Sequence, residues 1–435
     1  MPRLALRQHE CQSCEPHPRP RAVRSPPGRE NAGVDREAFA GLLGDEGQAL
    51  LGSLEGYDPD RELAVATRLR RTHAPELVSA ALAQARLRQR AAAKFGAEDA
   101  ARMYFTPNGL EQSTRASVAA YRAERFSAAG VPVLADLCCG IGGDAIALAR
   151  AGMHVLAVDS DPLTCDVVRA NAAALGLADR IEIRCQDVGD ADVSGCDAVF
   201  VDPARRGGKG RIFDPEAYSP PLSWAVEVAR RVSHAALKVA PGIPHEAVPD
   251  DAEAEWISDS GDVKEAVLWF GAGRGAGSTA ESSPVRATLL PGPRSLLSRG
   301  LADPPAGPVG RYLYEPDGAV VRAHLVAEVA AELNGRLIDP TIAYVTCDEP
   351  HVTPYATGYE ITDVLPFQLK RLRALLRERG IGTATIKKRG SAVEPAELRK
   401  KLKLEGPGIC TVFLTRVAGA PTVLLGQPLE GPAGA

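Results

Sequence analysis

Four aspartates of this 435-residue chain each follow a short apolar run, at a place where a buried strand would end. In order they are Asp136, Asp159, Asp187 and Asp202. The carboxyl ends of parallel strands meet at one edge of a sheet, because right-handed crossovers return the chain to the same side. Carboxylates gathered there can accept hydrogen bonds from the hydroxyl and amino groups of a ligand. The spacing therefore predicts one binding edge made by four strands.

A glycine turn separates the first two of these acids. Gly140, Gly142 and Gly143 stand between the apolar run that ends at Asp136 and a helical pattern at residues 145–150. Glycine lets the backbone approach a ligand where a Cβ would collide, and the free N–H groups of a helix start offer donors. Residues 140–145 also fit the G-x-G-x-x-G/A pattern of nicotinamide and flavin enzymes. The acid ahead of the glycines argues against such an oxidoreductase, as does the later Asp-Pro pair.

Each of the other acids suits one part of a nucleoside ligand. A carboxylate at Asp159 can accept from both hydroxyls of a ribose, and a side chain at Asp187 can accept from an adenine amino group. Asp202 and Pro203 follow the fourth apolar run, and the Asp202 carboxylate and the Pro203 carbonyl can both accept from an amino group of a substrate.

The order of acid, glycines, acid, acid and Asp-Pro over residues 100–270 resembles the class I S-adenosylmethionine-dependent methyltransferases. The resemblance implies S-adenosylmethionine as the cofactor and methyl transfer as the reaction. The form Asp-Leu-Cys-Cys-Gly-x-Gly looks more like nucleic-acid methyltransferases than small-molecule ones. The cofactor-binding residues that it implies are Asp136, Cys138, Gly140, Gly142, Asp159, Ser160, Asp187 and Val188, with Phe105 and Thr106 from a segment ahead of the first strand.

Methyl transfer is an in-line displacement, so the enzyme mainly has to position the nucleophile. Asp202 and Pro203 are the predicted catalytic residues, because their acceptors would hold an amino nitrogen with its lone pair toward the methyl group. Asp202-Pro-Ala-Arg205 resembles the Asp/Asn-Pro-Pro signature of these enzymes, but Ala204 replaces the second proline, so the methylated atom stays open. Arg205 and Arg206 in the following loop suit contacts to substrate phosphate, and a solvated basic loop is the alternative.

Composition narrows the class of protein. The chain is 45% hydrophobic and 24% charged, which is typical of globular proteins, and its length suits two or three domains. A net charge of −4 gives no overall cationic field, so a nucleic-acid partner needs a local basic patch. We expect the nine scattered cysteines to be reduced thiols of a cytoplasmic protein. The N-terminus has no apolar run with the length of a signal-peptide core, and no stretch of the chain is apolar over the length of a membrane span.

The first part of the chain divides into a tail and a helical region. Residues 1–34 are rich in Pro and Arg, and we expect disorder there. Their His9, Cys11, Cys14 and His17 are possible zinc ligands, but no second pair follows at the usual spacing. A flexible tail is the favoured interpretation, and no metal is predicted. Residues 35–129 carry apolar residues at helical spacing and predict helices.

Strands alternate with helical stretches over residues 130–270, which predicts an α/β fold with a parallel sheet and helices on both faces. Residues 234–242 look like the fifth strand, and residues 256–258 and 265–270 like a closing antiparallel pair. Residues 271–310 are crowded with Gly, Ser and Pro and predict a linker or an exposed loop. The predicted fold class is thus a Rossmann-like methyltransferase sheet between an N-terminal helical region and a small C-terminal α/β domain.

The unit at residues 311–427 resembles the THUMP-like domain found behind such methyltransferases. Cations outnumber acids between residues 361 and 405, although the whole chain is acidic. Lys387, Lys388 and Arg389 follow an apolar run, so we expect them to project together from a loop at a strand end and to contact phosphates. The predicted partner is a structured RNA such as tRNA or rRNA. A solvated basic face is the alternative.

Two other interpretations stay open. The segment ending at Cys347 resembles the nucleophile segment of the 5-methyluridine methyltransferases, in which a thiolate adds to the base. In that family the segment follows the Asp-Pro-Pro-Arg strand, whereas Cys347 lies beyond the linker, so a small buried hydrophobe is favoured. A non-catalytic RNA-binding protein that retains the fold is the second, and the four intact acids argue against it. The pattern leaves the oligomeric state open.

Overall fold

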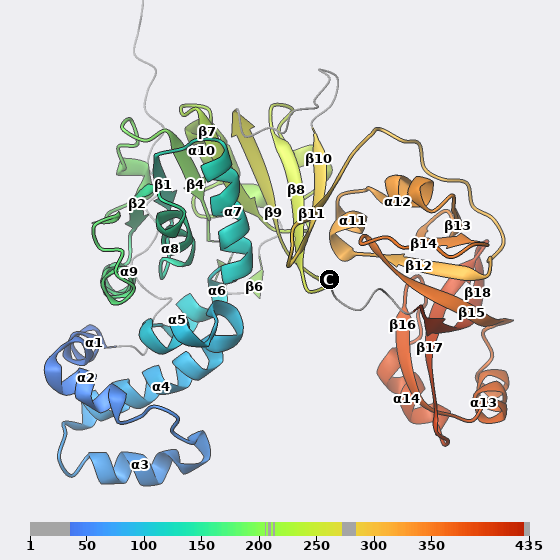
Figure 1. The fold of residues 1–435 in the computed structure, drawn as a ribbon, viewed down its shortest axis with the longest axis horizontal. Helices are drawn as coiled ribbons and strands as arrows, with labels where there is room; N and C mark the ends of the chain where they lie inside the picture. Colours follow the sequence, from blue (N-terminus) through green and yellow to red (C-terminus); the bar gives the residue numbers. More distant parts are fainter. Residues whose placement is uncertain (1–34, 205, 208–209, 212–213, 272–283, 430–435) are drawn as a thin grey trace, which may run out of the picture.

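The computed structural model describes residues 35–204, 206–207, 210–211, 214–271 and 284–429. Three parts follow one another along the chain (Figure 1). A group of helices comes first, then a nine-stranded sheet with helices on both faces, then a seven-stranded sheet with helices of its own. The predicted α/β class, with its helical N-terminal region and C-terminal α/β domain, is confirmed. The histidines and cysteines at residues 9–17 lie outside the described residues.

The helical region packs against one face of the larger sheet. Its helices are α1 Arg36–Leu43, α2 Asp45–Gly52, α3 Glu62–Leu69, α4 Pro75–Phe95, α5 Ala97–Arg102, α6 Pro107–Gln112 and α7 Ala116–Ala128. α4 starts with a proline in its first turn, and it ends at Gly96, whose φ of +82° favours glycine. Its buried side chains share one core with β1 (Val133–Leu137) and β2 (His154–Asp159). In the described part of the chain, no helix is both long enough and apolar enough to cross a bilayer.

The larger sheet brings the predicted acids to one edge. Its remaining strands are β3 Ile181–Cys185, β4 Ala198–Val201, β7 His234–Val239, β8 Glu253–Asp259, β9 Asp262–Gly271, β10 Val285–Leu290 and β11 Arg294–Leu297, in the order β11-β10-β8-β9-β7-β4-β1-β2-β3. The strands from β7 to β3 run parallel, and Leu137 lies beside both Val158 and Val201. The crossover helices are α8 Gly143–Arg150, α9 Pro162–Ala174 and α10 Leu222–Ala229. The carboxyl ends of these strands therefore form a single edge.

The far side of this sheet differs from the prediction in one respect. β8 and β9 pair antiparallel, as expected for residues 256–258 and 265–270. The predicted linker at residues 271–310, however, contains β10 and β11, and β10 pairs parallel with β8 over six residues, Val285–Leu290. The prediction of an uninterrupted loop is therefore wrong. β10 and β11 are short and lie among Gly, Ser and Pro residues, so the sequence has too few alternating residues there to predict strands.

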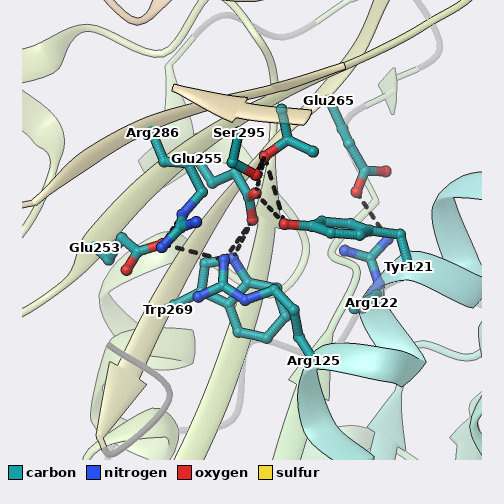
Figure 2. Close-up of polar contacts among 10 residues, drawn as sticks. Tyr121, Arg122, Arg125, Glu253, Glu255, Glu265, Trp269, Arg286 and Ser295 are labelled. Carbon is teal, nitrogen blue, oxygen red and sulfur yellow. Dashed lines mark hydrogen bonds and ion pairs between the residues drawn. The ribbon is translucent and has the colours of Figure 1, made fainter. Parts of the chain in front are cut away.

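A buried polar network joins α7 to these strands (Figure 2). Glu255 of β8 is fully buried, and it accepts hydrogen bonds from Tyr121 Oη at 2.6 Å, Arg125 Nη1 at 2.6 Å and Trp269 Nε1 at 2.9 Å. Thr288 of β10 adds a fourth donor at 2.5 Å. A buried carboxylate with this many donors is satisfied, so the network fixes how α7 and the sheet sit together.

The C-terminal domain has its own sheet and rests on the larger one. Its strands are β12 Tyr312–Pro316, β13 Arg336–Asp339, β14 Ile342–Cys347, β15 Ala356–Pro366, β16 Ile381–Lys388, β17 Gly408–Val417 and β18 Ala420–Pro428. Its helices are α11 Gly318–Arg322, α12 Val326–Glu332, α13 Leu369–Glu378 and α14 Pro395–Leu402. α11 lies against β8 and β10, and a Cβ at Gly318 would lie 2.5 Å from Val263 Cγ2. One hydrophobic core continues across this junction.

Candidate active site

The turn after β1 brings backbone close to the binding edge. Cys138, Gly140 and Gly142 have φ values of +64°, +55° and +85°. A Cβ at Gly140 would meet no other heavy atom within 4 Å, whereas one at Gly142 would lie 3.2 Å from Val168 Cγ1. Gly140 therefore faces open space that a ligand can fill. Gly142 lets the turn pack on α9 and is the residue directly before α8.

Asp159 at the end of β2 is held by the same turn. Its Oδ2 accepts from the N–H of Gly140 at 3.1 Å, and its Oδ1 accepts from the N–H of Asp161 at 3.0 Å. Burial raises the pKa of the Asp159 carboxyl above its ordinary value, although these two N–H groups act in the opposite direction. Each oxygen keeps a second lone pair, so the oriented carboxylate can still accept from two hydroxyls. Ser160, which follows, is exposed.

Asp136 in β1 is a buried acid that lacks donors. It is 1% exposed, and neither carboxylate oxygen has a hydrogen-bond partner among the described residues. Burial, followed by the negative charges of Asp144 and Asp202, raises the pKa of Asp136 well above its usual range. An unpaired buried carboxylate costs free energy unless a ligand supplies donors or positive charge. The site therefore fits a ligand that carries both.

Asp187 marks the outer end of the edge, after β3. Its Oδ1 accepts from the N–H of Gly189 at 2.8 Å and so caps the 3₁₀ turn Val188–Asp190. Asp187 and Val188 are both half-buried, and Val188 packs on the core that α10 also joins. One half-buried polar side chain and one half-buried apolar side chain suit the wall of a pocket for a planar base. Their contact with adenine stays a prediction.

Asp202, directly after β4, pairs with a lysine that the sequence analysis missed. Lys238 of β7 donates from Nζ to Asp202 Oδ2 at 2.7 Å and to Thr114 Oγ1 at 3.0 Å. Lys238 is 3% exposed, whereas the Asp202 side chain keeps 24% of its surface open. The lysine thus fixes one carboxylate oxygen and leaves Asp202 accessible from the edge. A cation inside the apolar run at residues 234–239 was the available clue.

Arg122 of α7 anchors the start of α8 beside this pair. It is fully buried, donates from Nε to Asp144 Oδ1 at 2.9 Å, and places Nη2 2.8 Å from Glu265 Oε1 (Figure 2). Burial alone would raise the pKa of Asp144, but the charges of Arg122 and Lys238 bring it below its ordinary value. The guanidinium also lies 4.2 Å from the ring centroid of Phe200 in β4. Arg122 therefore ties α7, α8, β4 and β9 together under the site.

Lys94 of α4 belongs to the helical region and interacts electrostatically with Lys238 and Asp202. Its Nζ donates to the carbonyls of Leu110 and Glu111 at 2.8 and 3.0 Å, near the end of α6. Burial, followed by the charges of Lys238 and Arg115, lowers the pKa of Lys94 to about 8. Two lysines from different parts of the chain thus border the site, and only Lys238 had a signal in the sequence, as a cation inside an apolar run.

The segment ahead of β1 packs on the glycine turn. A Cβ at Gly109 in α6 would lie 2.3 Å from Ile141 Cγ2, so α6 packs directly on the glycine turn. Phe105 and Thr106 are 0% and 1% exposed, and Thr106 Oγ1 accepts from the N–H of Gly109 as the cap of α6. Both side chains are used within the protein itself. A direct contact of either residue with the cofactor stays a prediction.

The predicted phosphate contacts after Asp202 fall largely outside the described residues. Arg205 is not among them, and Arg206 is described only as backbone in the two-residue strand β5, Arg206–Gly207. Arg206 pairs there with Arg211 in β6, Gly210–Arg211. The roles of Arg205 and Arg206 stay predictions.

The expectation that Lys387, Lys388 and Arg389 project together from a loop is wrong. The two lysines are the last residues of β16, where successive side chains point to opposite faces. Lys387 pairs with Glu315, and Lys388 with Glu394 at 2.6 Å. Arg389 lies 3.9 Å from Glu315 and donates to a backbone carbonyl. Acids on both faces therefore compensate these three cations.

Cys347 lies at the end of β14, in the C-terminal sheet. Its thiol donates to the Glu349 carbonyl at 3.0 Å, and burial raises the pKa of the thiol. Both features disfavour a thiolate, and the strand belongs to a different sheet from Asp202. The structure thus opposes the interpretation of Cys347 as a nucleophile. No group of three or more possible metal ligands occurs within the described ranges.

Parallel strands with a glycine turn after β1, an acid at the end of β2 and an Asp-Pro pair after β4 are typical of the methyltransferase class, and comparisons with known proteins agree. Residues 131–221 match the family described as RNA cap guanine-N2 methyltransferase, residues 356–428 match the THUMP domain-like family, and residues 35–91 match a domain of unknown function. An uncharacterized S-adenosylmethionine-dependent methyltransferase of Mycobacterium tuberculosis is 34% identical over 354 residues, covering 79% of this chain and 93% of that protein.

The chain therefore belongs to this family of S-adenosylmethionine-dependent methyltransferases and ends in a THUMP-like domain. An uncharacterized RNA methyltransferase of Parasynechococcus marenigrum is 35% identical over 91 residues, which is 20% of each chain. A solved structure of a protein assigned as a methyltransferase from Porphyromonas gingivalis W83 shares the fold, with a TM-score of 0.70, 23% identity, and coverage of 88% of this chain and 98% of that one.

Proposed function

We propose that this enzyme methylates an amino nitrogen of a base in a structured RNA. The Asp202–Lys238 pair carries the proposal for the acceptor atom. Its second carboxylate oxygen and the Pro203 carbonyl offer two acceptors at one place, which suits an –NH₂ group with two donors. The RNA is supported by the match to RNA cap guanine-N2 methyltransferases and by the relative named as an RNA methyltransferase.

Each residue of the site has its own role in this reaction. S-adenosylmethionine, when bound, supplies an electrophilic methyl group. Asp159 binds the ribose hydroxyls, Asp187 accepts from the adenine amino group, and Asp136 meets the donors at the methionine end. Asp202 accepts a hydrogen bond from one N–H of the substrate amino group and so sets the direction of the nitrogen lone pair. Lys238 is a positioning residue, because it holds Asp202 and does not itself face the substrate.

Direct detection of the methylated nucleoside tests this proposal. The protein is incubated with labelled S-adenosylmethionine and fractionated total RNA, and digested nucleosides are separated and identified by mass. We expect label in an N-methylated nucleoside from one RNA class. Label in a 2′-O-methyl or C5-methyl nucleoside would refute the amino nitrogen, and label confined to protein would refute the RNA.

A matched pair of variants isolates Asp202. Asp202→Ala removes an orienting acceptor, so we expect turnover to fall by about 10²-fold or more. Asp262→Ala is the control, since Asp262 also pairs with a lysine, Lys264 at 3.2 Å, but is exposed on β9. The control should keep full activity, and both variants should bind the cofactor within a few-fold of the native protein. Normal turnover in Asp202→Ala would assign the orientation to another group.

The surface proposed to bind the RNA is formed by α13 and α14, and not by the cations at the end of β16. The exposed cations on and directly after these two helices are Lys370, Arg371, Arg377, Arg379, Arg399, Lys400, Lys401 and Lys403. Both helices pack against β16 (Figure 1), so their cations are carried by ordered elements. Clustered cations on ordered elements suit the phosphates of a folded RNA.

A further inference from the structure

Three planar rings stack across the junction between the methyltransferase sheet and the C-terminal domain. The ring centroids of His245 and Trp256 lie 4.7 Å apart, with 14° between the planes. The centroids of His245 and His324 lie 3.8 Å apart, with 7° between the planes. Trp256 belongs to β8, and His324 follows α11. These three side chains, called the ring stack below, form a column to which both domains contribute.

His324 occupies a backbone position where glycine is the usual residue. It has a φ of +57°, its N–H donates to the carbonyl of Val321 at 3.2 Å, and the N–H of Leu325 donates to that of Val320 at 2.9 Å. This is the Schellman ending of a helix, whose left-handed residue is most often glycine. A side chain there is strained, and strain of this kind concentrates at functional sites.

The ring stack lies at the same edge of the sheet as the catalytic aspartate. His245 is in the segment that follows β7, whose Lys238 contacts Asp202. Trp256 and Val239 lie at the same level of the sheet, because both are paired with Ala266 of the intervening strand β9. The indole Nε1 of Trp256 donates to the Pro241 carbonyl at 3.0 Å. β8 is three strands from β4 in the sheet. At ~4.8 Å a strand, β8 lies roughly 14 Å from β4, so the pocket suits a nucleotide near the reacting one but not stacked on it.

A pocket of about 400 Å³ opens beside the ring stack, and its walls suit a nucleotide. His324 and Arg322 are exposed and line it, together with His245 and Glu246. Burial and the neighbouring His245 lower the pKa of His324, which favours the uncharged ring that stacks well. Arg322 offers donors to a phosphate, and Glu246 offers an acceptor to a base amino group.

We propose that this pocket binds a nucleotide flanking the methylated one, with its base stacked on His324 and its phosphate on Arg322. Stacking on an exposed ring combined with a cation is how single-stranded nucleotides are commonly held. The proposal rests on the RNA substrate inferred above. It adds a site next to the reacting base, distinct from the cations of α13 and α14, and it explains why the two domains meet through rings.

Two helix endings of the same kind provide a matched test. His324→Gly removes the ring and relieves the strain, so the melting temperature should stay the same or rise. Asn334→Gly is the control, because Asn334 ends α12 in the same way, with a φ of +46°, and is exposed away from the pocket lining. Fluorescence anisotropy with a labelled oligoadenylate and with a labelled transfer RNA measures affinity as a function of salt.

We expect His324→Gly to bind both RNAs roughly tenfold more weakly, and His324→Tyr, which keeps a ring, to stay close to the native protein. Arg322→Gln should make the salt dependence shallower by about one contact. Unchanged affinity in His324→Gly, or an equal loss in Asn334→Gly, would overturn the site. If the native protein binds neither RNA, the site falls, whereas methylation of fractionated total RNA decides the RNA substrate. If it binds RNA but transfers no methyl group to it, only the catalytic proposal falls.

Discussion

Among single side chains, Asp159 has the most direct expected effect on cofactor binding. It accepts from two backbone N–H groups and can still accept from two ribose hydroxyls. Asp159→Ala should weaken S-adenosylmethionine binding by about 2–3 kcal/mol, the range for hydrogen bonds to a charged group. Calorimetry on the native protein and on Asp159→Asn, which keeps the shape, separates charge from packing. Unchanged affinity in Asp159→Ala, or tight binding of NAD, would contradict the assignment.

The pKa of Lys94 can be measured and tests its burial beside the site. Its pKa of about 8 lies below the ordinary 10.5, so folding releases a proton between these two pH values. Lys94 therefore opposes folding at pH 8 and below, and this unfavourable contribution disappears as the pH rises to 10.5. Acetylation followed by peptide mass spectrometry should give a reaction rate at Lys94 with a midpoint near pH 8, with exposed Lys401 as the comparison. A midpoint of 10.5 would show that neither burial nor the charge of Lys238 acts on Lys94.

At the scale of elements, Arg122 holds α7, α8 and β9 together through its ion pairs. Arg122→Ala removes the closest cation from two buried carboxylates, Asp144 and Glu265, and leaves Glu265, among the described residues, with only Lys238 at 3.9 Å. We expect a loss of about 3–5 kcal/mol in the free energy of unfolding. Arg86→Ala is the matched control, because Arg86 pairs with Glu62 at 2.6 Å on the surface. That change should cost about 1 kcal/mol or less. Urea unfolding of both variants measures the difference, and equal losses would mean that the buried pair contributes little.

Elements with a strong periodic pattern could be predicted from the sequence, and contacts between distant elements could not. The apolar runs before Asp136, Asp159 and Asp202 predict β1, β2 and β4, because buried parallel strands are continuously apolar. Lys238 was missed because its partner lies on a neighbouring strand, 36 positions away in the sequence. β16 was mistaken at its end for a loop, since the pattern gives the strand but not its last residue.

On the scale of the whole molecule, charge is divided between the domains. The chain carries −4 overall, yet exposed cations gather on α13 and α14. Changing Arg371 and Arg399 together to Gln should weaken RNA binding and flatten its salt dependence, by up to ~0.9 in log–log slope per lost phosphate contact on the duplex-DNA scale. Changing Arg230 and Arg231, exposed cations after α10, provides the control with equal charge. Equal effects of the two double variants would mean that the cations of α13 and α14 have no specific role in RNA binding.

The return of the chain through β10 and β11 sets a lower limit on any separable catalytic piece. A fragment ending at Gly271 would keep every residue assigned to the reaction, yet it would strip the partner from one side of β8. Glu253 would lose Arg286, and Glu255 would lose Thr288, while six residues of β8 would expose unpaired backbone. Open strands of this kind recruit other chains and aggregate. Proteolysis or truncation should therefore yield a core that does not aggregate only when the cut falls beyond Leu297.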